Sequence, residues 1–99
     1  MAQVYIKVFK DPKYTLVAVC DTDLIGQTFR EGRLKLEVKV DFYKGSPSGI
    51  REALQALQAA DVANLVGEGI VQAAVQEGLV DPSAVLRIAG VPHVQIVRL

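Results

Sequence analysis

Two apolar runs near the start of the chain predict a pair of adjacent strands. Residues 4–9 alternate strongly apolar and less apolar side chains, which is the two-residue period of a strand with one buried face. Residues 16–20 are apolar at every position, which is typical of a central strand buried on both faces. Between them, residues 10–13 include Asp11 and Pro12, which both favour turns. We therefore expect the two strands to form a hairpin.

The next part of the chain predicts a loop, a third strand and a linker. Residues 21–32 carry turn and cap signals, and we expect a loop or a short helical turn there. Residues 33–40 alternate cleanly between charged and apolar side chains, which predicts a strand. Residues 42–49 contain several Gly, Ser and Pro residues and indicate a linker. The inward-facing side chains of the predicted strand are Leu34, Leu36, Val38 and Val40.

Two helices are expected after this linker. Ser48 is suited to cap a helix that begins at Ile50. A single straight helix would place Asp61 and Asn64 in its apolar stripe, which is costly for buried polar groups. We therefore expect a break near Ala60, with Asp61 as the cap of a second helix. The apolar stripe of that helix would consist of Val62, Leu65, Val66, Ile70, Ala73 and Ala74, and Gly78 would end it.

The C-terminal residues predict two more strands. Residues 85–88 and 93–98 are rich in apolar side chains, and a Gly-x-Pro turn lies between them. The expected element order is β-β-β-α-α-β-β, within one domain that spans residues 1–99. Short hairpin loops favour an antiparallel or mixed sheet with the helices packed on one face. The predicted fold class is therefore α+β.

The balance of charges narrows the range of functions. Eleven Lys and Arg residues balance eleven Asp and Glu residues in this chain of 99 residues. A net charge of zero argues against strong nonspecific binding of nucleic acid. The charge is slightly polarised, because residues 1–44 carry eight basic and six acidic side chains, whereas residues 45–99 carry three and five. This distribution is compatible with a mild basic face on the N-terminal half.

Cysteine content and hydropathy favour a cytoplasmic protein. Cys20 is the only cysteine, so the chain can form neither an internal disulfide nor a multi-cysteine zinc site. The sequence shows no signal peptide, and no apolar run reaches the ~20 residues that cross a membrane. Because 51% of the residues are hydrophobic, we expect one apolar face to form a homodimer contact, through an edge strand or the Ala-rich helix.

The predicted loop at 21–32 is a first candidate ligand site. Asp21 and Asp23, beside Gly26, would offer carboxylate oxygens to a cation or a ligand hydroxyl, although the spacing of a calcium loop is absent. Glu31 precedes a glycine at the start of a strand, where backbone N–H groups can approach a phosphate. The structural alternative is that these residues only form turns, helix caps or a bulge.

A second candidate site lies in the C-terminal half. Asn64, Gly67 and Glu68 lie where the helical phase fails, and such local inconsistencies are enriched at functional sites. His93 is the single histidine, and it shares one side of the last predicted strand with Gln95. An imidazole can transfer protons, bind a metal or stack on RNA. The structural alternative is that these residues satisfy helix ends and turns or allow close packing.

Basic side chains form a candidate surface for phosphate. Arg33, Lys35 and Lys39 would lie in one outward-facing row, with Lys7 nearby if the two strands pair. The alternative is an ordinary solvated face of the sheet. The sequence contains no nucleotide-binding loop, catalytic triad or paired histidines, so we predict no catalytic residue, no metal and no cofactor.

Four blocks of residues occur in a characteristic order along the chain. They are Val19 to Val38 (with Asp21, Gly26, Phe29 and Glu31-Gly32), Phe42-Tyr43-x-Gly45, Ala63 to Glu68, and Gly90 to Gln95. Together these blocks resemble a small archaeal family known only as domain of unknown function family 424. The resemblance implies an archaeal origin, a single α+β domain, no established activity, and an association with translation and ribosome-related genes.

These observations lead to two functional hypotheses. The preferred one is a non-enzymatic binding module that acts near RNA or the translation machinery. The alternative is a small enzyme or ligand-binding protein with a polar site around Asn64, Glu68 and His93. The alternative requires these three side chains to converge in space.

Overall fold

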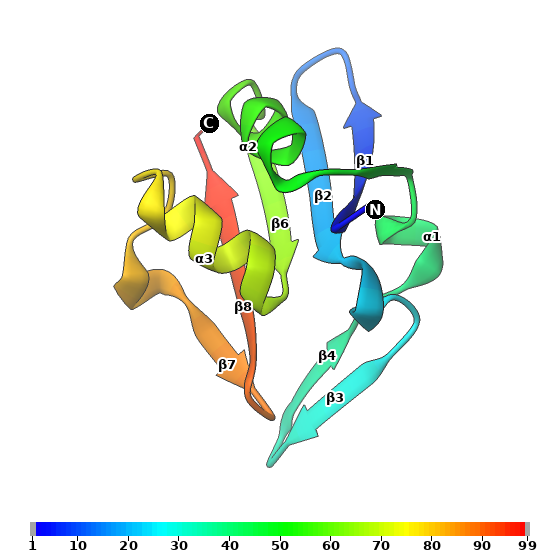
Figure 1. The fold of residues 1–99 in the computed structure, drawn as a ribbon, viewed down its shortest axis with the longest axis vertical. Coiled ribbons are helices and arrows are strands. Elements are labelled where there is room, and N and C mark those ends of the chain that lie inside the picture. Colours follow the sequence, from blue (N-terminus) through cyan, green and yellow to red (C-terminus); the bar gives the residue numbers. More distant parts are fainter. Residues whose placement is uncertain (1, 99) are drawn as a thin grey trace.

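The computed structural model describes residues 2–98, which form a six-stranded mixed sheet covered on both faces (Figure 1). The strand order is β5-β1-β2-β6-β8-β7. Strands β2 and β6 run parallel, and every other neighbouring pair is antiparallel. The strands are β1 (Val4–Lys10), β2 (Thr15–Asp21), β5 (Ser46–Ser48), β6 (Val62–Val66), β7 (Leu86–Ile88) and β8 (Val91–Val97).

The remaining elements cover this sheet. Helices α2 (Ile50–Gln58) and α3 (Glu68–Gln76) pack on one face. The other face holds the short helix α1 (Val40–Tyr43) and a two-stranded ribbon made of β3 (Thr28–Glu31) and β4 (Leu34–Glu37). Two single 3₁₀ turns complete the chain at Thr22–Leu24 and Pro82–Ala84. The predicted α+β class, the mixed sheet and the hairpin of the first two strands are confirmed.

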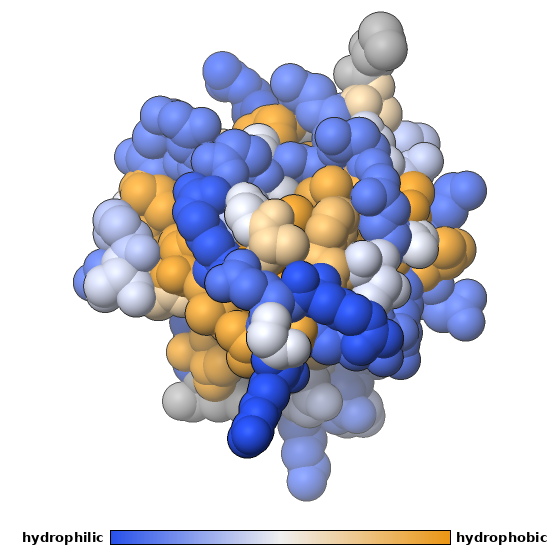
Figure 2. Space-filling model, turned by 90° about the horizontal axis from the view of Figure 1, so that it is seen from below, coloured by the Kyte–Doolittle hydropathy of each residue, from blue (hydrophilic) through white to orange (hydrophobic). Residues whose placement is uncertain are grey.

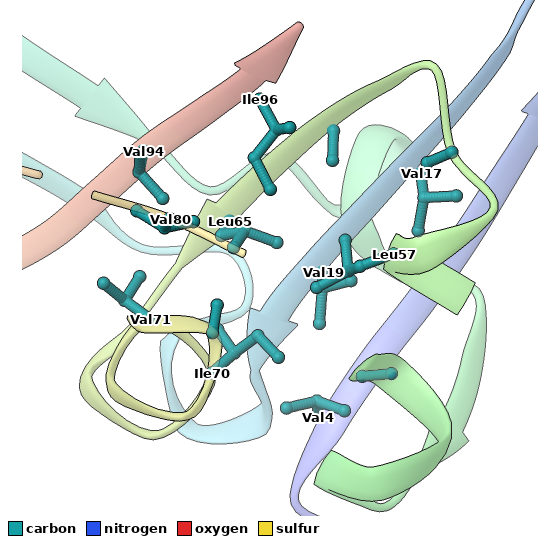
Figure 3. Close-up of a cluster of buried hydrophobic side chains, with 14 residues drawn as sticks. Val4, Val17, Val19, Leu57, Leu65, Ile70, Val71, Val80, Val94 and Ile96 are labelled. Atoms are coloured by element: carbon teal, nitrogen blue, oxygen red, sulfur yellow. The ribbon is translucent and has the colours of Figure 1, made fainter. Parts of the chain in front are cut away.

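The main core fills the space between the sheet and helices α2 and α3 (Figure 3). Alternate residues of β2, β6 and β8 point into it, because successive side chains of a strand face opposite sides. Helix α2 begins after Gly49, whose N–H donates to the carboxylate of Glu52 at 3.0 Å. The largest fully buried side chains of this core are Leu57, Leu65, Ile70, Val4, Val17 and Val19.

A second, smaller core lies on the opposite face of the sheet. The intervening residues of β2 and β6 enter it, which explains why the 16–20 run is apolar at every position. The ribbon and α1 close this core from outside. Its buried members are Ala18, Cys20, Leu36, Val38, Tyr43, Val66 and Ile88.

The prediction of a second helix from Asp61 onward is wrong in its first half. Residues 62–66 form the strand β6, which pairs with both β2 and β8. Asp61 does not cap a helix; its carboxylate accepts the N–H of Thr15 at 2.8 Å. The predicted break near Ala60 is real, and α3 starts only after Gly67. A short buried strand has no alternating pattern, so its apolar residues merge with the helical stripe that follows.

The predicted strand at 33–40 is shorter than expected. It ends at Glu37, and Val40 begins α1. Leu36 and Val38 are buried as predicted, whereas Leu34 and Val40 are 45% and 48% exposed. The partner of this strand is β3, which lies within the segment predicted to be a loop. The predicted linker contains the end of α1 and the edge strand β5, and Gly49 takes the capping position expected of Ser48.

Within residues 2–98, no helix is long and apolar enough to cross a membrane.

Candidate functional site

Asp21 holds the start of helix α3. Its carboxylate, at the end of β2, accepts the backbone N–H of Gly69 at 2.8 Å and of Ile70 at 3.1 Å. The first N–H groups of a helix have no partner within the helix, so a carboxylate there satisfies them. Burial raises the pKa of Asp21, the two hydrogen bonds oppose this rise, and nearby Asp23 and Glu68 add to it. The structural explanation of Asp21 as a helix cap therefore holds.

Gly67 lets this carboxylate approach the helix. Its φ of +117° lies in a region that side chains rarely adopt. A Cβ at this position would lie 2.4 Å from Cγ of Asp21. Gly69 is also close, because a Cβ there would meet the Asp21 carboxylate at 3.1 Å. The Gly-Glu-Gly sequence thus makes room for a contact between segments that are far apart in the chain.

The same end of the sheet carries a small acidic hollow of about 140 Å³. It brings together three predicted site residues, Asp21, Asp23 and Glu68, with Leu24 and residues 90–92. Across residues 2–98, no group of three His, Cys, Asp or Glu side chains is placed to hold a metal ion. Since Asp21 already accepts two N–H groups, this hollow offers few free ligand atoms.

Glu68 forms an ion pair that is not predicted from the sequence. Its two carboxylate oxygens accept hydrogen bonds from the Arg87 guanidinium at 2.9 and 3.2 Å. Both side chains are more than half exposed, so solvent screens the pair and it contributes little to stability. Beside it lies a hollow of about 560 Å³ between α3 and the segment 82–87. Arg87 could not be found from sequence, because nothing marks its partner 19 residues away.

Asn64 and Gln95 form a hydrogen-bonded pair on the face of the sheet that carries the second core. They are register partners on β6 and β8, and the Gln95 amide donates to Oδ1 of Asn64 at 2.9 Å. Asn64 is 9% exposed and is the one buried polar side chain among residues 2–98. His93 lies on the same face of β8, opposite Val66 and Leu86, and burial lowers the pKa of its imidazole.

The alternative polar site does not form as a unit. Glu68 pairs with Arg87, Asn64 pairs with Gln95, and no hydrogen bond joins either of them to His93 within residues 2–98. None of the hollows described above is lined by Glu68 and His93 together.

Glu31 and Gly26 form hydrogen bonds that stabilise the ribbon and the turn beside it. The Glu31 carboxylate accepts the N–H of Ala89 at 2.6 Å, in the tight turn between β7 and β8. Ala89 has a positive φ of 51°, so this hydrogen bond holds a turn of unfavourable backbone conformation. Gly26, at φ +80°, donates its N–H to the carbonyl oxygen of Val38 at 2.7 Å and closes the base of the ribbon.

The predicted basic row is divided between two surfaces. Lys35 lies on β4, with Arg33 in the turn before it and Lys39 between β4 and α1, whereas Lys7 lies on β1 and donates to the carbonyl oxygen of Asp41. Beside Lys7 lies a group of aromatic rings that the sequence analysis did not single out. It consists of Tyr5, Phe9, Phe42 and Tyr43, with Lys44 above the ring of Tyr5.

Comparison with known proteins shows the fold and the family of this chain. A crystal structure of an uncharacterized conserved protein from Methanopyrus kandleri has the same fold, with a TM-score of 0.76. The match covers 94% of this chain and 89% of that chain at 24% sequence identity. No curated protein matches the chain significantly. Residues 9–99 match the family described as protein of unknown function (DUF424), so the resemblance seen in the sequence is confirmed and the chain belongs to this family.

Proposed function

We propose that this protein is a non-enzymatic RNA-binding module that uses the outer face of the β3–β4 ribbon. The observation that carries the proposal is the charge of this face. Phe29 and Leu36 point toward the sheet, so their neighbours along each strand point outward. The outward side chains, with the turn and the residue before α1, are Thr28, Arg30, Arg33, Lys35, Glu37 and Lys39.

This face therefore presents four cations and one carboxylate. The Lys35 ammonium lies 2.9 Å from Glu37, and its hydrogen bond and charge lower the pKa of Glu37. The positive charges of Lys39 and Arg30 lower this pKa further. One acid cannot neutralise four bases, so this face retains a net positive charge although the whole chain has none.

The shape of the ribbon also supports this function. It projects from one end of the molecule, beside the turn between β7 and β8 (Figure 1). Seen from this end, strongly hydrophilic side chains project around and across a hydrophobic surface (Figure 2). Exposed Lys and Arg residues that contact phosphates provide most of the affinity of sequence-independent RNA binding. The translation context implied by the family resemblance agrees with this proposal.

Salt-dependent binding tests the proposal directly. Binding of labelled ribosomal RNA fragments is measured by fluorescence anisotropy between about 50 and 200 mM salt. The double variant Arg30→Gln/Lys35→Gln should bind more weakly, and its salt slope should fall by about one for each phosphate that the protein no longer neutralises. The matched control is Lys10→Gln/Lys13→Gln, which removes the same charge at the β1–β2 turn. Undetectable binding at low salt, or equal weakening in both double variants, refutes the proposal.

A further inference from the structure

We infer that the aromatic cluster on β1 and α1 stacks on unpaired bases, so that the RNA ligand of this protein is single-stranded. This inference rests on the proposed function and adds the class of RNA that is bound. The aromatic cluster is defined by Tyr5, Phe9, Phe42 and Tyr43.

The cluster contains two partly exposed rings that pack against each other. Phe9 and Phe42 stack with centroids 5.3 Å apart and an interplanar angle of 21°. Tyr43 is buried and meets Phe42 edge-on at 4.9 Å, so it supports Phe42 from the protein interior. Phe9 and Phe42 themselves are only partly buried. Partly exposed aromatic faces of this kind accept bases of any sequence, because every base has a π face.

Two lysines bring positive charge to these rings. Nζ of Lys7 lies 5.3 Å from the Phe9 centroid, and Nζ of Lys44 lies 5.8 Å from the Tyr5 centroid. Each ammonium lies over a ring, so a base that stacks on that ring displaces it, and the long lysine side chain can then turn toward the phosphate of the base. Rings and cations together match a nucleotide better than they match an apolar protein surface.

The platform formed by these rings lies beside an unpaired part of the β1 edge, and the chain connects it directly to the ribbon. Strand β5 pairs only with residues 4–6 of β1, so residues 7–10 have no strand neighbour on that side within the described chain, residues 2–98. Lys39 ends the ribbon segment and immediately precedes α1, which carries Phe42. An RNA strand that follows the cations of the ribbon therefore reaches the rings. A duplex keeps its bases stacked inside and cannot use them.

The test compares an oligouridine strand with an RNA duplex, using variants that change only the ring. Phe42→Leu keeps an apolar side chain but removes the aromatic face, and Phe42→Tyr keeps it. Phe42→Leu should reduce affinity for oligouridine by about fivefold or more, the lower limit of one base–aromatic stack, and leave duplex binding unchanged. Phe42→Tyr should bind like the parent protein. Thermal melts establish that both variants fold.

A second measurement needs no variant. In the unmodified protein, the ring protons of Phe9 and Phe42 should shift in NMR spectra when oligouridine is added, and should not shift with duplex RNA. Rings that stay unshifted at saturating oligouridine overturn the inference.

The outcomes separate this inference from the proposed function. If Phe42→Leu binds oligouridine normally while Arg30→Gln/Lys35→Gln binds none, the platform is overturned and the ribbon stands. If neither RNA binds, both are overturned. Polyglutamate that binds as tightly as oligouridine, with the same sensitivity to Phe42→Leu, would assign the platform to an acidic protein partner and overturn the RNA inference.

Discussion

Replacing Gly67 with alanine should destabilise the fold far more than an ordinary glycine substitution. Gly67 precedes α3, and the Asp21 carboxylate lies directly against it. The added Cβ would lie 2.4 Å from Cγ and 2.8 Å from Cβ of Asp21, which no pair of real atoms sustains. Either Asp21 leaves the helix start, or β2 and α3 move apart.

The magnitude follows from two separate costs. A residue with a Cβ at φ +117° and ψ 151° costs about 1–3 kcal/mol in backbone strain. Displacing Asp21 weakens two hydrogen bonds from N–H groups to a charged oxygen, each worth about 1.5–3 kcal/mol. We expect Gly67→Ala to lower the free energy of unfolding by at least ~3 kcal/mol, out of the roughly 5–15 kcal/mol typical of a domain.

Urea unfolding followed by circular dichroism measures this destabilisation. Gly78→Ala is the matched control, because Gly78 also has a positive φ, of +75°, but no atom within 4 Å of an added Cβ. It should cost only about 1–2 kcal/mol. In an Asp21→Gly background both the Cγ and the Cβ of residue 21 are absent, so the steric conflict is gone and Gly67→Ala should cost only its backbone strain there. Equal costs of Gly67→Ala in both backgrounds, within ~0.5 kcal/mol, would refute the reasoning.

Three further predictions concern the last strand and the buried thiol. Deleting residues 93–99 should unfold the chain, because β8 pairs with β6 along these residues and buries Val94 and Ile96; a thermal melt like that of the full chain would contradict this. His93→Ala should stay folded and flatten the pH dependence of stability below pH 6.5. Burial lowers the pKa of His93, so the unfolded chain binds the proton more readily, and the free energy of unfolding should rise with pH from the lowered pKa to about 6.5. Burial raises the pKa of Cys20 to about 12. A thiol reagent should therefore label Cys20 at neutral pH only at the rate at which the protein unfolds. Fast labelling of the native protein would contradict this and show that the second core is open.

The hydrophobic pattern predicts those elements whose two faces differ or whose ends carry clear signals. The hairpin of β1 and β2 is local, and Asp11 and Pro12 mark its turn. The hydrophobic pattern does not predict strand β6. This strand is buried on both faces and so lacks alternation, and the helical residues that follow it extend its apolar run. The hydrophobic pattern does not predict strand β3 either, because only Phe29 and Glu31 face the protein and the two form no clear apolar alternation.

The candidate sites depend on contacts that no local pattern contains. Asp21 and Gly69 are 48 residues apart, and only the parallel pairing of β2 with β6 brings them together. Both ends of this contact are nonetheless marked in the sequence, as an acid after an apolar strand and a Gly-Glu-Gly break. The aromatic platform leaves no such mark, because Phe9 and Phe42 lie on separate elements and each fits an ordinary packing role.

The parallel pairing of β2 with β6 has a consequence for how quickly the chain folds. The β1–β2, β3–β4 and β7–β8 hairpins each join neighbouring residues, so their loops close at little entropic cost. Pairing Leu16 with Val62 instead requires the whole segment between them to be folded back first. The β1–β5 and β6–β8 pairings are also long-range, and we expect these closures to limit the folding rate, so that mutations in β6, which takes part in two of them, slow folding. The β3–β4 ribbon proposed to bind RNA does not depend on these slow steps for its own pairing, because its closure is local.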